Sequence, residues 1–258
     1  MFEDVTLNFG FKDGPSGAHS SRTMMFSEVE LLFAYLGPNS KAEDYQNGIE
    51  NLNLLNKPTS RSRNLTWKHL QSLYGMDPSI PLFRVFRRLW EVDEQARTLL
   101  ACQMALTRDP ILRMSESKLK DTALETLLSR EDMVEMFEKE FPNRFSQTSL
   151  ESMAKNVNAT WTNAGFLKGK TKKYRTEPNV RAVNVAFALL LGYVQGASGK
   201  RLFTTRWVNL LQCRTERLYE LARVSNDIGL ICFKHSSEVV DITFPNLITR
   251  EEEAWLSE

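Results

Sequence analysis

The chain has 258 residues, of which 42% are hydrophobic and 10% aromatic; this is ample for a packed core and excludes disorder over most of its length. Its formal net charge is only +1, but the charges are unevenly distributed. Residues 142–217 carry 13 Lys and Arg against 3 Glu (+10), residues 1–141 carry 17 basic and 21 acidic side chains (−4), and residues 218–258 carry 3 and 8 (−5). A dense positive region attracts phosphate backbones whatever the total charge is. The imbalance therefore favours nucleic-acid binding.

The cysteines and the apolar segments indicate the protein class. Cys102, Cys213 and Cys232 lie far apart, with no CxxC pair, which is typical of free thiols in a reducing compartment and not of a metal site. The N-terminus has no apolar run behind a basic start, and Ala182–Val194 is shorter than the roughly 20 residues that cross a bilayer. We expect a soluble, cytoplasmic protein with no membrane segment, metal or other cofactor.

The first half of the chain has helical periodicity. Residues 1–24 are rich in Gly, Ser, Asp and Pro, and we expect them to form a flexible arm. From residue 25 to residue 141, apolar side chains recur at helical spacing and Gly or Pro separates the segments, which predicts a helical bundle. Thr98–Thr107 is apolar nearly all round, as expected of a central helix.

The second half, residues 142–247, is predicted to be a winged-helix-like basic region. A helical face ends near Gly165 and is followed by a basic hairpin or loop; the face consists of Leu150, Met153, Ala154, Val157 and Trp161. Later come two helices, Gly229 and two strands, Leu230–Lys234 and Val239–Phe244, joined by His235–Glu238. Residues 248–258 read as an acidic tail. The predicted fold class is mainly α, an N-terminal helical bundle followed by a C-terminal helical part with winged-helix-like β-hairpins.

Two basic clusters are candidates for phosphate binding. The first is the hairpin after Gly165, with Lys168, Lys170, Lys172, Lys173 and Arg175. The second lies at or near the starts of two helices, where free N–H groups favour phosphate; its members are Lys200, Arg201, Arg206, Arg214 and Arg217. The alternatives are a merely solvated loop for the first cluster and pairing with Glu216 or Glu220 for the second.

Signals of catalysis are weak. Gly196–Lys200 evokes a phosphate-binding loop, but the Walker pattern needs a Gly where the chain has Val194 and a Ser or Thr where it has Arg201. Glu116 and Lys118 superficially resemble part of a metal-dependent nuclease, yet they lie in a helical pattern and not on strands. We therefore expect no enzyme, no catalytic residue and no metal ligand, with a nuclease as a distant alternative.

The order of these features resembles the BrxA family of bacterial BREX phage-defence systems, helical proteins whose N-terminal part is similar to the NusB fold. The resemblance covers roughly residues 25–247. It rests on Leu54–Thr59 before an Arg-containing helix, the central apolar helix, Phe145-Ser146, Trp161 before Gly165, and a final hairpin ending Phe244-Pro245. It implies a non-enzymatic, DNA-associated accessory component that acts with larger methyltransferase, ATPase and phosphatase-like subunits. It implies no catalytic residue.

These observations predict an accessory protein of a phage-defence system. It would bind double-stranded DNA through a basic C-terminal surface, largely without reading bases, and would associate with other defence subunits. The alternative is a protein-interaction adaptor whose basic region docks on an acidic surface of another subunit, with no nucleic-acid contact.

Overall fold

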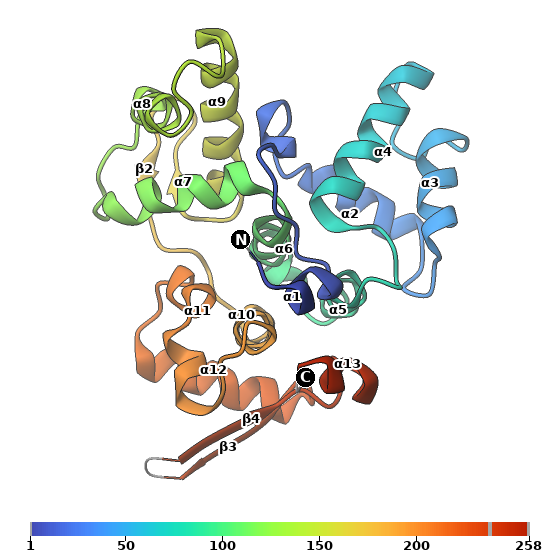
Figure 1. The fold of residues 1–258 in the computed structure, drawn as a ribbon, viewed down its shortest axis with the longest axis vertical. Helices are drawn as coiled ribbons and strands as arrows, with labels where there is room; N and C mark the ends of the chain where they lie inside the picture. The colour runs from blue at the N-terminus through green and yellow to red at the C-terminus, as the bar shows by residue number, and fades with distance from the viewer. Residues whose placement is uncertain (1, 237–238, 257–258) are drawn as a thin grey trace.

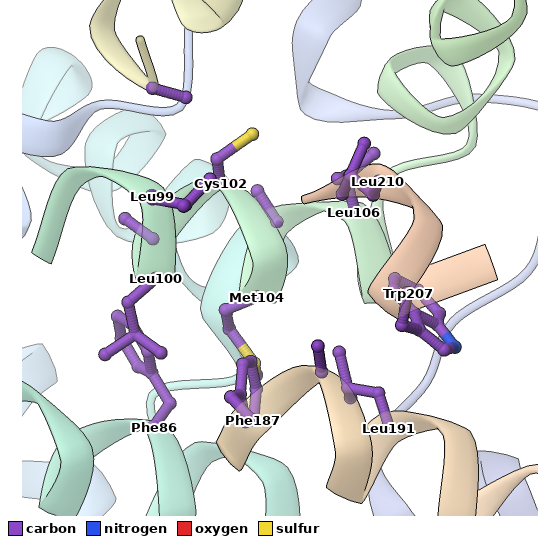
Figure 2. Close-up of a cluster of buried hydrophobic side chains, with 14 of the residues drawn as sticks. Phe86, Leu99, Leu100, Cys102, Met104, Leu106, Phe187, Leu191, Trp207 and Leu210 are labelled. Carbon is purple, nitrogen blue, oxygen red and sulfur yellow. The ribbon is translucent and has the colours of Figure 1, made fainter. Parts of the chain in front are cut away.

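The computed structural model describes residues 2–236 and 239–256, and their central element is the helix α6 (Arg97–Arg108). Its side chains between Leu99 and Thr107 are buried on every side. Figure 2 shows Phe86 of α5 (Pro81–Trp90), Phe187 of α10 (Ala182–Val194) and Trp207 of α11 (Arg206–Leu210) converging on it. The all-round apolar pattern cannot be satisfied by one neighbour, so α6 is enclosed by three parts of the chain. The prediction of a central helix is confirmed.

The helices of residues 25–141 form two groups beside α6 (Figure 1). The first group consists of α2 (Phe26–Tyr35), α3 (Ala42–Glu50), α4 (Ser60–Tyr74) and α5. The second consists of α7 (Pro110–Asp121) and α8 (Arg130–Glu140). Local signals set their starts: Thr59 and Ser129 cap α4 and α8, and Pro81 and Pro110 occupy the first turns of α5 and α7. The mainly helical fold class is confirmed.

Residues on the two sides of Pro142 pack together. The helix α9 (Gln147–Asn163) lies against α8, and after Gly165 the strands β1 (Leu167–Lys168) and β2 (Tyr174–Arg175) form an antiparallel hairpin. In Figure 1 these elements gather with α7 on one side of α6, apart from the C-terminal elements. The structure thus differs from the predicted division at residue 142, because the apolar face of α9 is buried against the preceding helices.

The C-terminal part has the element order of a winged helix. The helices α10, α11 and α12 (Thr215–Asp227) precede the antiparallel strands β3 (Cys232–Ser236) and β4 (Val239–Thr243), and a 3-10 helix, η3 (Gly199–Thr204), lies beside β4. Phe233 pairs with Ile242, and both side chains are buried. The second hairpin is confirmed, although residues 237 and 238 of its predicted turn lie outside the described residues.

The N-terminal segment is folded onto the helices, which differs from the predicted flexible arm. It contains α1 (Asp4–Phe9) and a short 3-10 helix, η1 (Ala18–Ser20); Phe9 and His19 are fully buried. A Cβ atom on Gly17 would lie 2.1 Å from Oδ1 of Asp109, so only glycine allows this close approach. The Gly and Ser content predicts mobility, whereas in the folded chain Gly17 permits tight packing.

The acidic tail also packs on the molecule. It contains the helix α13 (Arg250–Trp255). Oε2 of Glu252 lies 2.6 Å from Nη2 of Arg84 on α5. The rings of Trp255 and the buried Phe9 meet edge to face, with their centroids 5.7 Å apart. Residues 257 and 258 lie outside the described part of the chain. The tail therefore covers the N-terminal segment, because its apolar side chains complete the same core.

Across the described residues, no single helix has the length and apolar character needed to cross a membrane. The segments Ala182–Val194 and Gly199–Leu210 reach that length and apolar content only as a pair, and the pair is bent by 111°.

Candidate nucleic-acid interface

The first basic hairpin is fixed by a third extended segment. The backbone N–H of Leu128 donates to Lys173 O at 2.8 Å, and the N–H of Arg175 donates to Thr126 O at 2.9 Å, so β2 lies between β1 and residues 125–128. The turn depends on Gly169, which has φ +110°, and a Cβ there would lie 2.1 Å from Lys172 O. The hairpin is thus not a free wing, because backbone pairing on both sides of β2 and the glycine at 169 constrain its turn.

A groove of about 580 Å³ opens beside this turn. Its walls are residues 127–131 at the start of α8, Lys155 and Asn158 of α9, and residues 170–173 of the hairpin turn. Three segments far apart in sequence therefore meet at one surface. We call this feature the hairpin groove.

The hairpin groove is strongly positive. Five cations and one carboxylate, Glu131, line it, a formal charge of 5 − 1 = +4; the cations are Arg130, Lys155, Lys170, Lys172 and Lys173. Nη2 of Arg130 lies 3.8 Å from Oε1 of Glu131. By contrast, none of the three lysines Lys155, Lys170 and Lys172 forms an ion pair with any described residue. Partial burial lowers the pKa of Lys173, whose Nζ donates to Gly169 O at 3.1 Å. Clustered unpaired cations favour phosphate, because each can exchange a counterion for a phosphate oxygen.

Arg175, predicted as a phosphate contact, is instead a buried structural residue. Only 1% of it is exposed, and its guanidinium donates to Leu119 O at 3.1 Å, to Phe166 O at 2.9 Å, and to Thr176 O and Gln212 Oε1. Burial lowers its pKa, and nearby Glu177 opposes that shift. It therefore ties the hairpin to α7 and to the turn before α12. The prediction was wrong for this residue because strand alternation turns it inward.

The rest of the predicted cations are not gathered at the groove. Lys168 pairs with Glu125 at 2.8 Å, and Arg206 pairs with the buried Glu116. Lys200 and Arg201 are exposed on η3, beside β4 and in the C-terminal part of the molecule. The two predicted clusters therefore lie on different parts of the fold.

Arg214 and Arg217 lie at the start of α12 in a hollow of mixed charge. Glu177, Glu216 and Glu220 line the same hollow, so its formal charge is 2 − 3 = −1. Arg217 pairs with Glu220 at 3.0 Å. Arg217 therefore pairs with an acidic neighbour, which was the alternative to phosphate binding for this cluster. A hollow with a negative formal charge does not favour phosphate.

Two cations of the groove, Arg130 and Lys155, were not predicted. Arg130 follows the Ser129 cap, and its next two neighbours in sequence, Glu131 and Asp132, are acidic. Lys155 stands alone on the polar face of α9. Only the packing of α8 on α9 brings both to the hairpin. The local sequence contains no signal for that arrangement.

A buried polar cluster holds the N-terminal segment in place. Nδ1 of His19 lies 2.9 Å from Oδ2 of Asp109, and Nε2 lies 2.8 Å from Oγ1 of Thr160. All three side chains are at most 1% exposed, and Thr160 Oγ1 also accepts from the Met24 N–H at 3.0 Å. Thr160, His19 and Asp109 are linked in the same order as the nucleophile, base and acid of a catalytic triad. All three are fully buried, however, which leaves no room for a substrate beside them. The cluster docks η1 between α7 and α9.

Other chemistry is sparse in the described part of the chain. It contains no group of three or more His, Cys, Asp or Glu placed to hold a metal ion. Its cysteines are free thiols, and burial raises the pKa of Cys102 far above the usual range, which makes that thiol unreactive.

No protein-family model matches the chain, and a search of curated proteins finds no match.

Proposed function

We propose that this protein binds double-stranded DNA through its backbone phosphates and that the hairpin groove is the centre of the contact. The observation that carries the proposal is the convergence of five cations from three segments on a groove with one carboxylate. Phosphate contacts of this kind supply affinity without reading bases.

The fixed shape of the groove supports this proposal. Backbone hydrogen bonds from residues 125–128 and the Gly169 turn hold the lysines in place, so binding orders only their side chains. A preorganised surface loses less conformational entropy on binding than a mobile basic loop. Lys200 and Arg201 on η3 offer a second, separate phosphate contact for a long duplex.

A role in a BREX-like phage-defence complex is part of this proposal through the sequence resemblance alone. On that basis the protein would be a non-enzymatic accessory subunit that brings larger partner subunits to DNA. It would act in the cytoplasm, where phage DNA is met.

A mobility-shift assay with a random-sequence duplex tests the binding. The test variant replaces four groove cations by alanine: Arg130, Lys155, Lys170 and Lys172. We expect its affinity to fall at least about 10-fold, because several phosphate contacts are lost together.

A matched control removes the same charge elsewhere. Four exposed cations outside both basic regions are replaced by alanine: Lys41, Arg61, Lys68 and Arg250. We expect near-normal affinity for the control. An equal loss of DNA affinity in both variants would contradict a contact centred on the groove. If the unmodified protein gives no mobility shift at about micromolar concentration, the adaptor alternative is favoured, in which the basic groove docks on an acidic protein surface.

A further inference from the structure

Two exposed apolar side chains lie side by side at the edge of the hairpin groove. Leu127, which lines the groove, is 42% exposed, and Tyr174 of β2 is 38% exposed. The two residues form an antiparallel bridge, and the backbone hydrogen bonds run between the residues that flank the pair. Side chains of such a non-hydrogen-bonded pair lie close together on one face of the sheet.

The ring of Tyr174 stands on the outward face of this small sheet. On the other side of β2, Tyr174 pairs with Lys168, whose side chain is 55% exposed, whereas the next residue of the strand, Arg175, is buried. Lys168 in turn forms an ion pair with Glu125, so this end of the row is neutral. The row therefore runs from an ion pair across the ring to Leu127, where it enters the positive groove.

The ring has no partner in the described part of the chain. There its hydroxyl makes no hydrogen bond, and the ring makes no aromatic or cation–π contact. An exposed ring beside cations is the combination that binds an unpaired base, because the base stacks on the ring while its phosphate meets the cations. Lys172 lines the groove two residues before Tyr174, and two residues span at most about 7 Å. A base on the ring therefore keeps its phosphate within reach of the groove lysines.

We propose that Tyr174 and Leu127 stack on an unpaired base of a DNA strand whose phosphates lie in the hairpin groove. The formal charge of the groove, +4, selects a polyanion, and the ring adds a contact for a base. Bases inside an intact duplex are stacked on one another, so the ligand class is duplex DNA with a single-stranded end. The inference rests on the proposed function and adds a preference for an unpaired end to it.

Fluorescence anisotropy with the unmodified full chain tests the base contact directly. The ligands are a blunt duplex, the same duplex with a short single-stranded overhang, and that overhang with abasic sites in place of its bases. The abasic overhang keeps every phosphate, so only the bases differ. We expect the intact overhang to bind about 10-fold tighter than the abasic one, from the stacking of one base. Equal affinities for the two overhangs would overturn the inference.

Variants assign the contact to one ring. Tyr174→Ala should abolish the difference between intact and abasic overhangs, whereas Tyr174→Phe keeps the ring and should retain the difference. The control is Tyr35→Ala, at a tyrosine of α2 that is 62% exposed, and it should also retain the difference. A difference that persists in folded Tyr174→Ala would place the base elsewhere. The abasic comparison uses the unmodified protein and does not depend on how the variants fold.

The same titrations separate this inference from the proposed duplex contact. A preference for the intact overhang without any binding of the blunt duplex would leave this inference standing and contradict the duplex contact. Binding of the blunt duplex with equal affinities for the two overhangs would do the reverse. No binding of any of these ligands at about micromolar protein would contradict both and favour an acidic protein surface as the occupant of the groove.

Discussion

At the scale of single residues, Arg175 shows how a basic side chain can serve the fold instead of the ligand. Its guanidinium has four protein acceptors and is almost fully buried. We expect Arg175→Met to lower the free energy of unfolding by about 3 kcal/mol, because carbonyl groups are left without a donor. Lys172→Ala, at an exposed position of the same hairpin, should change it by less than about 0.5 kcal/mol.

Urea denaturation of the two variants measures this difference. If Arg175→Met is as stable as Lys172→Ala but loses DNA affinity, Arg175 would be a ligand contact after all.

Asp109 gives the molecule a pH-dependent contribution to stability. Burial alone would raise its pKa, but the His19 ring, the His19 N–H and the Leu112 N–H together hold it below the ordinary value of 3.8. A carboxyl with a lowered pKa stabilises the folded state above its unfolded pKa, and this contribution is lost as the pH falls through the folded pKa. We expect Asp109→Asn to cost about 2 kcal/mol at neutral pH and clearly less below about pH 4.

Unfolding free energies of both proteins across this pH range test the claim. The control is Asp241→Asn, an exposed carboxylate on β4. A cost for Asp109→Asn that is the same at neutral and acid pH would show that charge is not involved.

At the scale of elements, Gly169 in the turn between β1 and β2 shapes the groove without contributing charge. Gly169→Ala keeps every cation but forces an alanine to φ +110° with its Cβ against Lys172 O. The turn must shift, so we expect DNA affinity to fall about 5-fold although the net charge is unchanged.

Gly196→Ala is the matched control. Its φ is also positive, at +82°, but a Cβ there has open space and lies outside the groove. We expect unchanged affinity for it in the same titration. Equal affinities of the two glycine variants would show that turn shape does not matter.

Individual elements could be predicted because their signals are local. The all-round apolar run of α6, the stripe of α9 and the alternation in β4 each follow from nearest neighbours in sequence. The N-terminal segment could not be predicted in this way, because its order comes from contacts such as His19 with Asp109 and Thr160, which are 90 and 141 residues away. The same reason explains why Arg130 and Lys155 were missed.

At the scale of the whole molecule, the positive segment of the sequence is not a single positive surface. Packing divides it into the hairpin groove, the exposed pair Lys200 and Arg201, and cations neutralised by Glu116, Glu125 and Glu220. The groove stays positive because α8 and α9 add two cations to the hairpin. Local charge density identifies the positive segment, but only the tertiary arrangement separates exposed, unpaired cations from cations in structural ion pairs.

The salt dependence of duplex affinity tests the central claim most directly. Affinity for one random duplex is measured over a series of salt concentrations for the unmodified protein, the four-cation groove variant and the four-cation control. Each phosphate contact contributes about 0.9 to the slope of log affinity against log salt, so the groove variant should have a slope smaller by about 3–4 and the control an unchanged slope. A groove variant with the affinity and slope of the unmodified protein would contradict the claim that this groove binds the phosphate backbone.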